Sequence, residues 1–218
     1  MRFFSRFLEI LSDFLFPKSE KVLSLEKLSA SKIIDLLPPS TLSQEETFAL
    51  FDYAHPLTKE LVWEIKYNGN RALAEKLGQV LYDTILSELE ERNTPERFPT
   101  ILLMPLPISG KRLFERGWNQ AELLSSAVKK FDLGDQFKHL PFQLSKVRHT
   151  ESQTHTANKS ERLHNLKDSM KVLNPKVVEG RCVVLVDDVT TTGATFSEAR
   201  RALKEAGAKK ILCFAIAH

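Results

Sequence analysis

The 218-residue sequence contains few cysteines: Cys182 and Cys213 are the only two, and each lies in an apolar run. This pattern is typical of small buried side chains in a reducing compartment, and it excludes a disulfide framework. The two cysteines are far apart in the sequence and form no thiol cluster with the six histidines, so we expect no zinc site. A metal used by this protein would need oxygen ligands.

Glycine and proline are also scarce, with eight and ten residues. This excludes collagen-like, linker-rich or disordered sequence and is compatible with many helices. The 31 basic and 28 acidic side chains leave a net charge of only +3. The chain therefore lacks the strong positive field of a dedicated nucleic-acid binder, and any role on DNA must depend on local features.

Long uninterrupted apolar runs are missing as well. The phenylalanine-rich N-terminus is interrupted by Arg2, Arg6, Glu9 and Asp13, so it predicts neither a membrane span nor a signal peptide, and we expect a cytoplasmic protein. Its apolar residues recur at three- and four-residue steps, which is typical of an amphipathic helix. We expect this helix to pack on the main domain or a partner chain, with adsorption to a membrane as the alternative.

Two parts are expected along the chain. Residues 1–46 form a helical appendage, because the polar stretch that ends it contains Pro38 and Pro39. Residues 47–218 form the main domain. Its strands are predicted at 47–53, 98–104, 140–147, 182–186 and 211–217, and its helices at 56–66, 71–92 and 120–130.

The clearest pattern lies near the C-terminus. The apolar run Cys182–Val186 predicts a strand covered on both faces, which Asp187 and Asp188 end. A loop rich in threonine follows, then a helix that Gly207 ends, then the strand at 211–217. The right-handed crossover rule predicts that the two strands are parallel.

This loop lies where open α/β sheets bind their ligands, at the carboxyl ends of the strands. Threonine hydroxyls, one glycine and a helix N-terminus favour a phosphate. Two adjacent carboxylates would repel phosphate alone, so the ligand must also present hydroxyl groups or arrive with Mg²⁺, as a sugar phosphate does. The sequence has neither a Walker loop nor a dinucleotide-binding G-x-G-x-x-G at this place.

The segment VVLVDDVTTTGAT resembles the motif with which type I phosphoribosyltransferases bind phosphoribosyl pyrophosphate (PRPP). LVWEIKYNGN, KRLFERGWNQAELL and TESQT are similar to the ComF family of competence-associated, phosphoribosyltransferase-like proteins, and the resemblance covers about residues 52–217. Many ComF proteins carry a four-cysteine zinc module at the N-terminus. Residues 1–50 of this chain contain no cysteine.

The resemblance implies an α/β fold with a central, mainly parallel sheet flanked by helices. It also implies Mg²⁺ as cofactor and PRPP as substrate. Asp187 and Asp188 would contact the ribose and its Mg²⁺, and Arg116 would help catalysis with Lys111 and Arg112 at the pyrophosphate. The loop around the 5′-phosphate would consist of Thr190, Thr191, Thr192, Gly193, Ala194 and Thr195.

Several interpretations remain open at this point. Arg116 precedes Trp118 and Asn119, which could anchor and cap a helix without a role in binding. Lys66 could face the ligand or end a helix in solvent, and solvation is the expectation. The polar residues 148–161 are expected to form a mobile loop that orders over bound Mg²⁺·PRPP.

Two functions fit these features. The chain could transfer a phosphoribosyl group from PRPP to an unidentified acceptor and release pyrophosphate, in a context of competence or DNA uptake. Alternatively, it could be a non-catalytic, PRPP-responsive adaptor that binds single-stranded DNA or a helicase partner of the DNA-uptake machinery.

Overall fold

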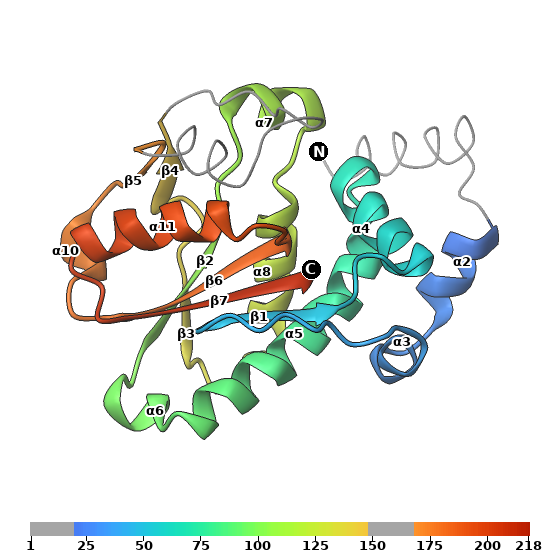
Figure 1. Cartoon of the computed structure of the whole chain (residues 1–218), viewed down its shortest axis with the longest axis horizontal. Helices are drawn as coiled ribbons and strands as arrows, with labels where there is room; N and C mark the ends of the chain where they lie inside the picture. The colour runs from blue at the N-terminus through green and yellow to red at the C-terminus, as the bar shows by residue number, and fades with distance from the viewer. Residues whose placement is uncertain (1–19, 148–167) are drawn as a thin grey trace.

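A computed structural model of the chain describes residues 20–147 and 168–218 and contains a five-stranded sheet in the order β1-β7-β6-β2-β3 (Figure 1). Every neighbouring pair of strands in this sheet is parallel. The α/β fold class expected from the sequence is therefore confirmed. The strands are β1 (Thr47–Phe51), β2 (Ile101–Pro105), β3 (Phe137–His139), β6 (Cys182–Val189) and β7 (Lys210–Ala217).

Helices cover both faces of the sheet. Figure 1 shows α11 on one side and α4 and α5 on the other. Alternate residues of β6 divide between two apolar cores: Val184 and Val186 belong to the first, and Val183 and Leu185 to the second. The helices are α4 (Pro56–Asn68), α5 (Arg71–Glu91), α6 (Thr94–Arg97), α7 (Gly110–Arg116), α8 (Gln120–Phe131), α10 (Pro175–Val178) and α11 (Ala194–Glu205).

The strand β6 differs from its prediction at one point. Asp187 and Asp188 do not end it, because the strand continues to Val189 and Asp187 pairs with Ala215 of β7. The two acids are therefore held by the backbone of a central strand. The parallel pairing of β6 with β7 and the left-handed Gly207 beyond α11 agree with the sequence prediction.

Other differences concern short elements. The segment predicted as a loop before residue 120 contains the helix α7, whose N-terminus is capped by the Ser109 hydroxyl. The predicted strand 140–147 contains only β4 (Leu144–Lys146), which pairs with β5 (Met170–Val172) in a separate antiparallel hairpin. β3 and β5 were not predicted, because three residues are too few to show a period-2 pattern.

The described part of the predicted appendage packs closely on the main domain. Its helices α2 (Glu20–Lys27) and α3 (Ala30–Leu36) bury Val22, Leu25 and Ile33 in the first core, together with α5 and the sheet. The boundary at residue 46 stays a prediction. The amphipathic helix predicted at the N-terminus and the predicted loop 148–161 lie outside the described residues. Of the helices that the structure describes, none is long and apolar enough to cross a membrane.

The two cysteines lie on neighbouring central strands and are both fully buried and unpaired. Burial raises the pKa of each thiol to about 12, so both stay protonated at neutral pH. We expect neither to react with a soluble thiol reagent at pH 8 in the native protein, and both to react in denaturant. Rapid labelling of the native chain, measured by mass spectrometry, would contradict this.

Candidate functional site

The candidate site is built around the two acids at the carboxyl end of β6. Successive side chains of a strand point to opposite faces of the sheet. Asp188 accordingly contacts residues of α4 and α8 on one face, while Asp187 interacts with Lys146 of the β4–β5 hairpin on the other. The acids thus reach two different surroundings.

Asp188 is almost completely buried, with 4% of its surface exposed. Its Oδ2 atom lies 3.6 Å from Nζ of Lys66, and Nε2 of Gln120 donates to Oδ1 over a long 3.5 Å. Oδ2 accepts no hydrogen bond in the structure. A buried carboxylate oxygen without a hydrogen bond is costly, so this atom is available to a bound group.

Asp187 is partly exposed, and its Oδ1 accepts a hydrogen bond of 2.8 Å from the backbone N–H of Asp188. Burial of the carboxyl group and the neighbouring Asp188 carboxylate raise the pKa of Asp187 well above its ordinary value, and Lys66 opposes this. Removing the ionised form from water and placing it beside a like charge both favour the proton. A cation or hydroxyl donor at this point would stabilise the charged form.

The loop after β6 forms a small hollow of about 40 Å³ beside Asp187, lined by residues 189–196. Gly193 has a left-handed backbone (φ 73°) and is the N-cap of α11, with no side-chain cap bond. The first N–H groups of a helix lack partners within the helix, and they point at the end where an anion is stabilised. All six predicted loop residues, Thr190 to Thr195, therefore lie together around one potential anion site.

Arg116 is brought towards the acids by α7 and α8. Its Nη1 donates to Oε1 of Gln120 over 3.1 Å, and its guanidinium lies 5.1 Å from the centroid of the Tyr67 ring. Gln120 connects it to Asp188, which in turn faces Lys66. Arg116 thus belongs to a network of side chains that reaches Asp188.

The cap that the sequence predicted after Arg116 is present as well. Oδ1 of Asn119 accepts from the N–H of Ala121 at the start of α8. Trp118 is half-buried; its indole donates to the carbonyl of Ile65 over 3.1 Å, and its ring lies against Gly69. The structural interpretation of this segment, an anchor and a cap, is therefore confirmed, and the functional role of Arg116 stays a prediction.

The remaining predicted cations lie in different surroundings. Lys111 is exposed on α7 and pairs with Glu115 of the same helix, 3.9 Å away, and among the described residues no hydrogen bond or ion pair joins it to either acid. Arg112 is half-buried and interacts with Lys146, whose pKa is lowered by burial and by this like charge, while Asp187 opposes the shift. Arg112, Lys146 and Asp187 therefore share one electrostatic environment.

Four residues at or beside the site were missed or judged differently from sequence. Lys66 was expected in solvent, yet it forms the ion pair with Asp188; its position at the end of α4 could have suggested this. Gln120 and Lys146 carried no motif signal. The Gln44 side chain lies against Gly193, because a Cβ atom added to Gly193 would be 3.0 Å from Oε1 of Gln44.

The described residues contain no cluster of three or more histidine, cysteine or acidic side chains that could hold a metal by themselves. The two acids nevertheless fit a Mg²⁺ ion that arrives with a phosphorylated ligand. They supply hard oxygen atoms, and one of these is buried without a hydrogen bond.

Comparison with known proteins identifies the class to which this fold and site belong. Residues 129–218 match the family model of the phosphoribosyl transferase domain, and this match includes β6, the loop and α11. The chain belongs to the ComF/YhgH family of proteins with such a domain. The sequence-based assignment to ComF is thereby confirmed.

Two relatives illustrate the extent of the similarity. The chain is 31% identical to the DNA utilization protein YhgH of Salmonella typhimurium over 160 residues, which cover 73% of this chain and 66% of that protein. It is 35% identical to competence protein ComFC of Bacillus subtilis over 151 residues, 69% of this chain and 55% of that protein. The chain thus spans just under two thirds of the first relative and about half of the second.

The chain also matches a solved structure that is described as an analysis of an invariant aspartic acid in HPRTs, a glutamic acid mutant. The alignment covers 72% of this chain and 67% of that chain. Its sequence identity is 12% and its TM-score 0.36.

Proposed function

We propose that the chain binds Mg²⁺·PRPP at the end of β6 and transfers its 5-phosphoribosyl group to an acceptor, with release of pyrophosphate. One observation carries this proposal: Asp187 lines a loop hollow at a helix N-terminus, and its neighbour Asp188 has a buried carboxylate oxygen without a hydrogen bond. The oxygen suits a ribose hydroxyl or its metal, and the hollow suits the 5′-phosphate.

The chemistry assigned to each residue follows from its charge. In the transfer, the bond from the anomeric carbon to the pyrophosphate oxygen breaks, and its electron pair leaves with pyrophosphate. Positive charge develops on the sugar, and negative charge on the leaving group. Asp187 and Asp188 hold the ribose hydroxyls. The negative charge on pyrophosphate is stabilised by Arg116 and Arg112.

Asp187 and Asp188 would also be the protein ligands of the metal. When bound, Mg²⁺ neutralises phosphate charge and orients the pyrophosphate. Nζ of Lys66 lies 3.6 Å from Oδ2 of Asp188, so a positive charge faces the carboxylate that would accept hydrogen bonds from the ribose hydroxyls.

A second function is supported by the relatives. They are described as a DNA utilization protein and a competence protein, so the chain could bind PRPP without turnover and act as an adaptor on single-stranded DNA or a DNA-uptake protein. In that case the same loop would sense PRPP, and the phosphoribosyl bond would stay intact.

Pyrophosphate release separates the two functions. We expect the chain, incubated with PRPP, Mg²⁺ and a fractionated metabolite extract, to release pyrophosphate in at least one fraction above the PRPP-only control. An enzyme-coupled pyrophosphate assay measures this. The release should fall with Asp188→Asn and persist with Asp83→Asn, which removes an exposed carboxylate on α5. If calorimetry shows that PRPP binds but no fraction leads to release of pyrophosphate, the adaptor function is favoured.

A further inference from the structure

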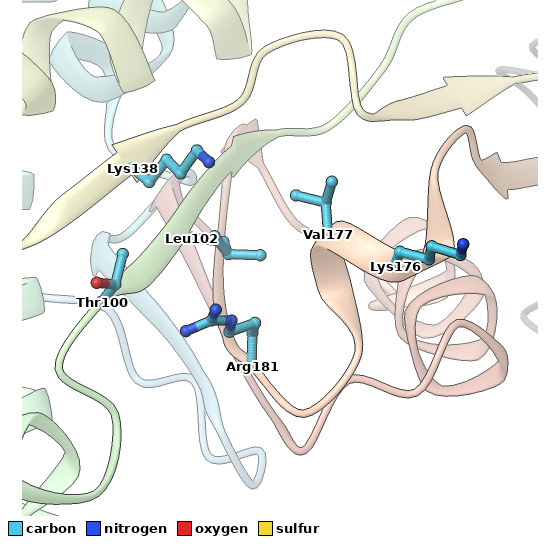
Figure 2. Close-up of a pocket in the computed structure, with 6 residues that line it drawn as sticks. All are labelled: Thr100, Leu102, Lys138, Lys176, Val177 and Arg181. Atoms are coloured by element: carbon cyan, nitrogen blue, oxygen red, sulfur yellow. The ribbon is translucent and has the colours of Figure 1, made fainter.

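A second cavity lies at the amino ends of the strands, away from the candidate site (Figure 2). It has a volume of about 350 Å³ and is lined by Thr100, Leu102, Lys138, Lys176, Val177 and Arg181. Thr100 and Arg181 immediately precede β2 and β6, the strands whose other ends reach the candidate site. At about 3.3 Å per residue, Arg181 and Asp187 are roughly 20 Å apart along β6.

Three of the six lining residues are cations, and none is an acid. In the parts of the chain that the structure describes, the side chains of Lys138, Lys176 and Arg181 form no hydrogen bond or ion pair. Three unpaired like charges around one cavity repel each other, and an anion would relieve that repulsion.

The floor of the cavity is apolar. Leu102 is 2% exposed, and Val177 lies between it and Lys176 (Figure 2). Lys138 and Arg181 flank Leu102 in the same view, so two cations border an apolar surface. The Arg181 position is fixed by its carbonyl, which accepts the N–H of Lys209 over 2.9 Å.

We propose that this cavity binds a nucleoside phosphate, with the phosphates on Lys138, Lys176 and Arg181 and the base or sugar on Leu102 and Val177. The volume is in the range of small-molecule sites, which combine apolar walls with a few converging polar groups. Arg181 offers a planar donor pair for phosphate oxygens, and the two lysines add point charges. The hydroxyl of Thr100 is a further donor at the rim.

A single-stranded nucleic acid shares this phosphate chemistry but fits the geometry less well. Binding along a strand requires a charged groove over several nucleotides and exposed aromatic rings for the bases. The cations here converge on one compact cavity, and no aromatic residue lines it. The structure therefore favours a small nucleotide.

Calorimetry with the full chain tests this. ATP, ADP, AMP and inorganic pyrophosphate are titrated without Mg²⁺, and the affinity for nucleotides should increase with phosphate number. The double variant Lys138→Gln/Arg181→Gln should weaken ATP binding at least about tenfold, because two charged contacts are lost. The control Lys204→Gln changes an exposed lysine on α11 and should leave it unchanged. Thermal melts verify that both variants fold.

The same samples separate this inference from the proposed function. Mg²⁺·PRPP binding should be equal in the double variant and the parent, and ATP should still bind the parent in excess Mg²⁺·PRPP. Failure of the parent to bind PRPP would leave the nucleotide result standing. Equal ATP affinity in the double variant and the Lys204→Gln control would overturn the proposal. So would a single-stranded oligonucleotide that binds through Lys138 and Arg181 where no mononucleotide does.

Discussion

Replacement of Asp188 by asparagine is expected to weaken Mg²⁺·PRPP binding by roughly 10- to 150-fold, as is the same change at Asp187. A hydrogen bond with a charged partner contributes about 1.5 to 3 kcal/mol, and asparagine lacks the charge that the metal or the ribose hydroxyls use. Isothermal titration calorimetry measures the loss. The control Asp83→Asn removes a carboxylate from the exposed surface of α5 and should bind like the parent.

Stability should hold or rise in these variants. The pKa of Asp187 is raised by burial and by Asp188, so the folded chain binds this proton more tightly than the unfolded chain. Its stabilising contribution is present below the unfolded pKa of about 4 and is lost as the pH rises through the folded pKa. At neutral pH the charge of Asp187 therefore costs stability, and Asp187→Asn removes that cost.

Thermal melting at pH 7 and pH 4 checks the sign. The melting temperature of Asp187→Asn should exceed that of the parent by more at pH 7 than at pH 4. Variants that bind PRPP normally, or that unfold before binding can be measured, would remove the main support for the sugar-phosphate assignment.

The second large effect is expected at Gly78, where α5 and α8 approach closely. A Cβ added to this buried glycine would lie 2.3 Å from Cβ of Ala127 and 3.0 Å from its carbonyl carbon. The clash is with backbone and with a side chain that cannot rotate away, so the helices must separate. Gly78→Ala should therefore destabilise the fold by about 2 kcal/mol, although alanine is the better helix former.

For a chain of this size the loss corresponds to a melting temperature roughly 4 to 8 °C lower. Gly110→Ala is the matched control: it places alanine in the first turn of α7, where an added Cβ meets nothing within 4 Å. It should be neutral or slightly stabilising. If the Gly78→Ala and Gly110→Ala variants have the same melting temperature, the contact between α5 and α8 is not tight in solution.

Sequence reasoning was most successful where local chemistry and tertiary structure agree. The apolar run of β6 is covered on both faces, Gly207 takes the positive φ that ends α11, and Asn119 caps α8. Each of these needs only a few neighbouring residues to be recognised. The loop after β6 was found for the same reason, because its threonines and glycine are consecutive.

It was less successful where contacts join distant segments. The ion pair of Lys66 with Asp188 joins residues 122 positions apart, and no spacing rule relates them. The extension of β6 through two acids contradicts strand propensity; pairing with β7 on one side holds it in the sheet. The short helix α7 was missed although Ser109, its cap, precedes a run of good helix formers.

The strand order also has a consequence for the timing of assembly during synthesis. β1 leaves the ribosome early, but the strand on which it pairs, β7, begins only at Lys210. Central β6 is likewise made after β2 and β3. The strands β1 and β2 must therefore wait with unpaired edges, a state prone to aggregation, until β6 and β7 are translated. The nascent chain thus acquires the candidate site and the completed sheet in the same late step.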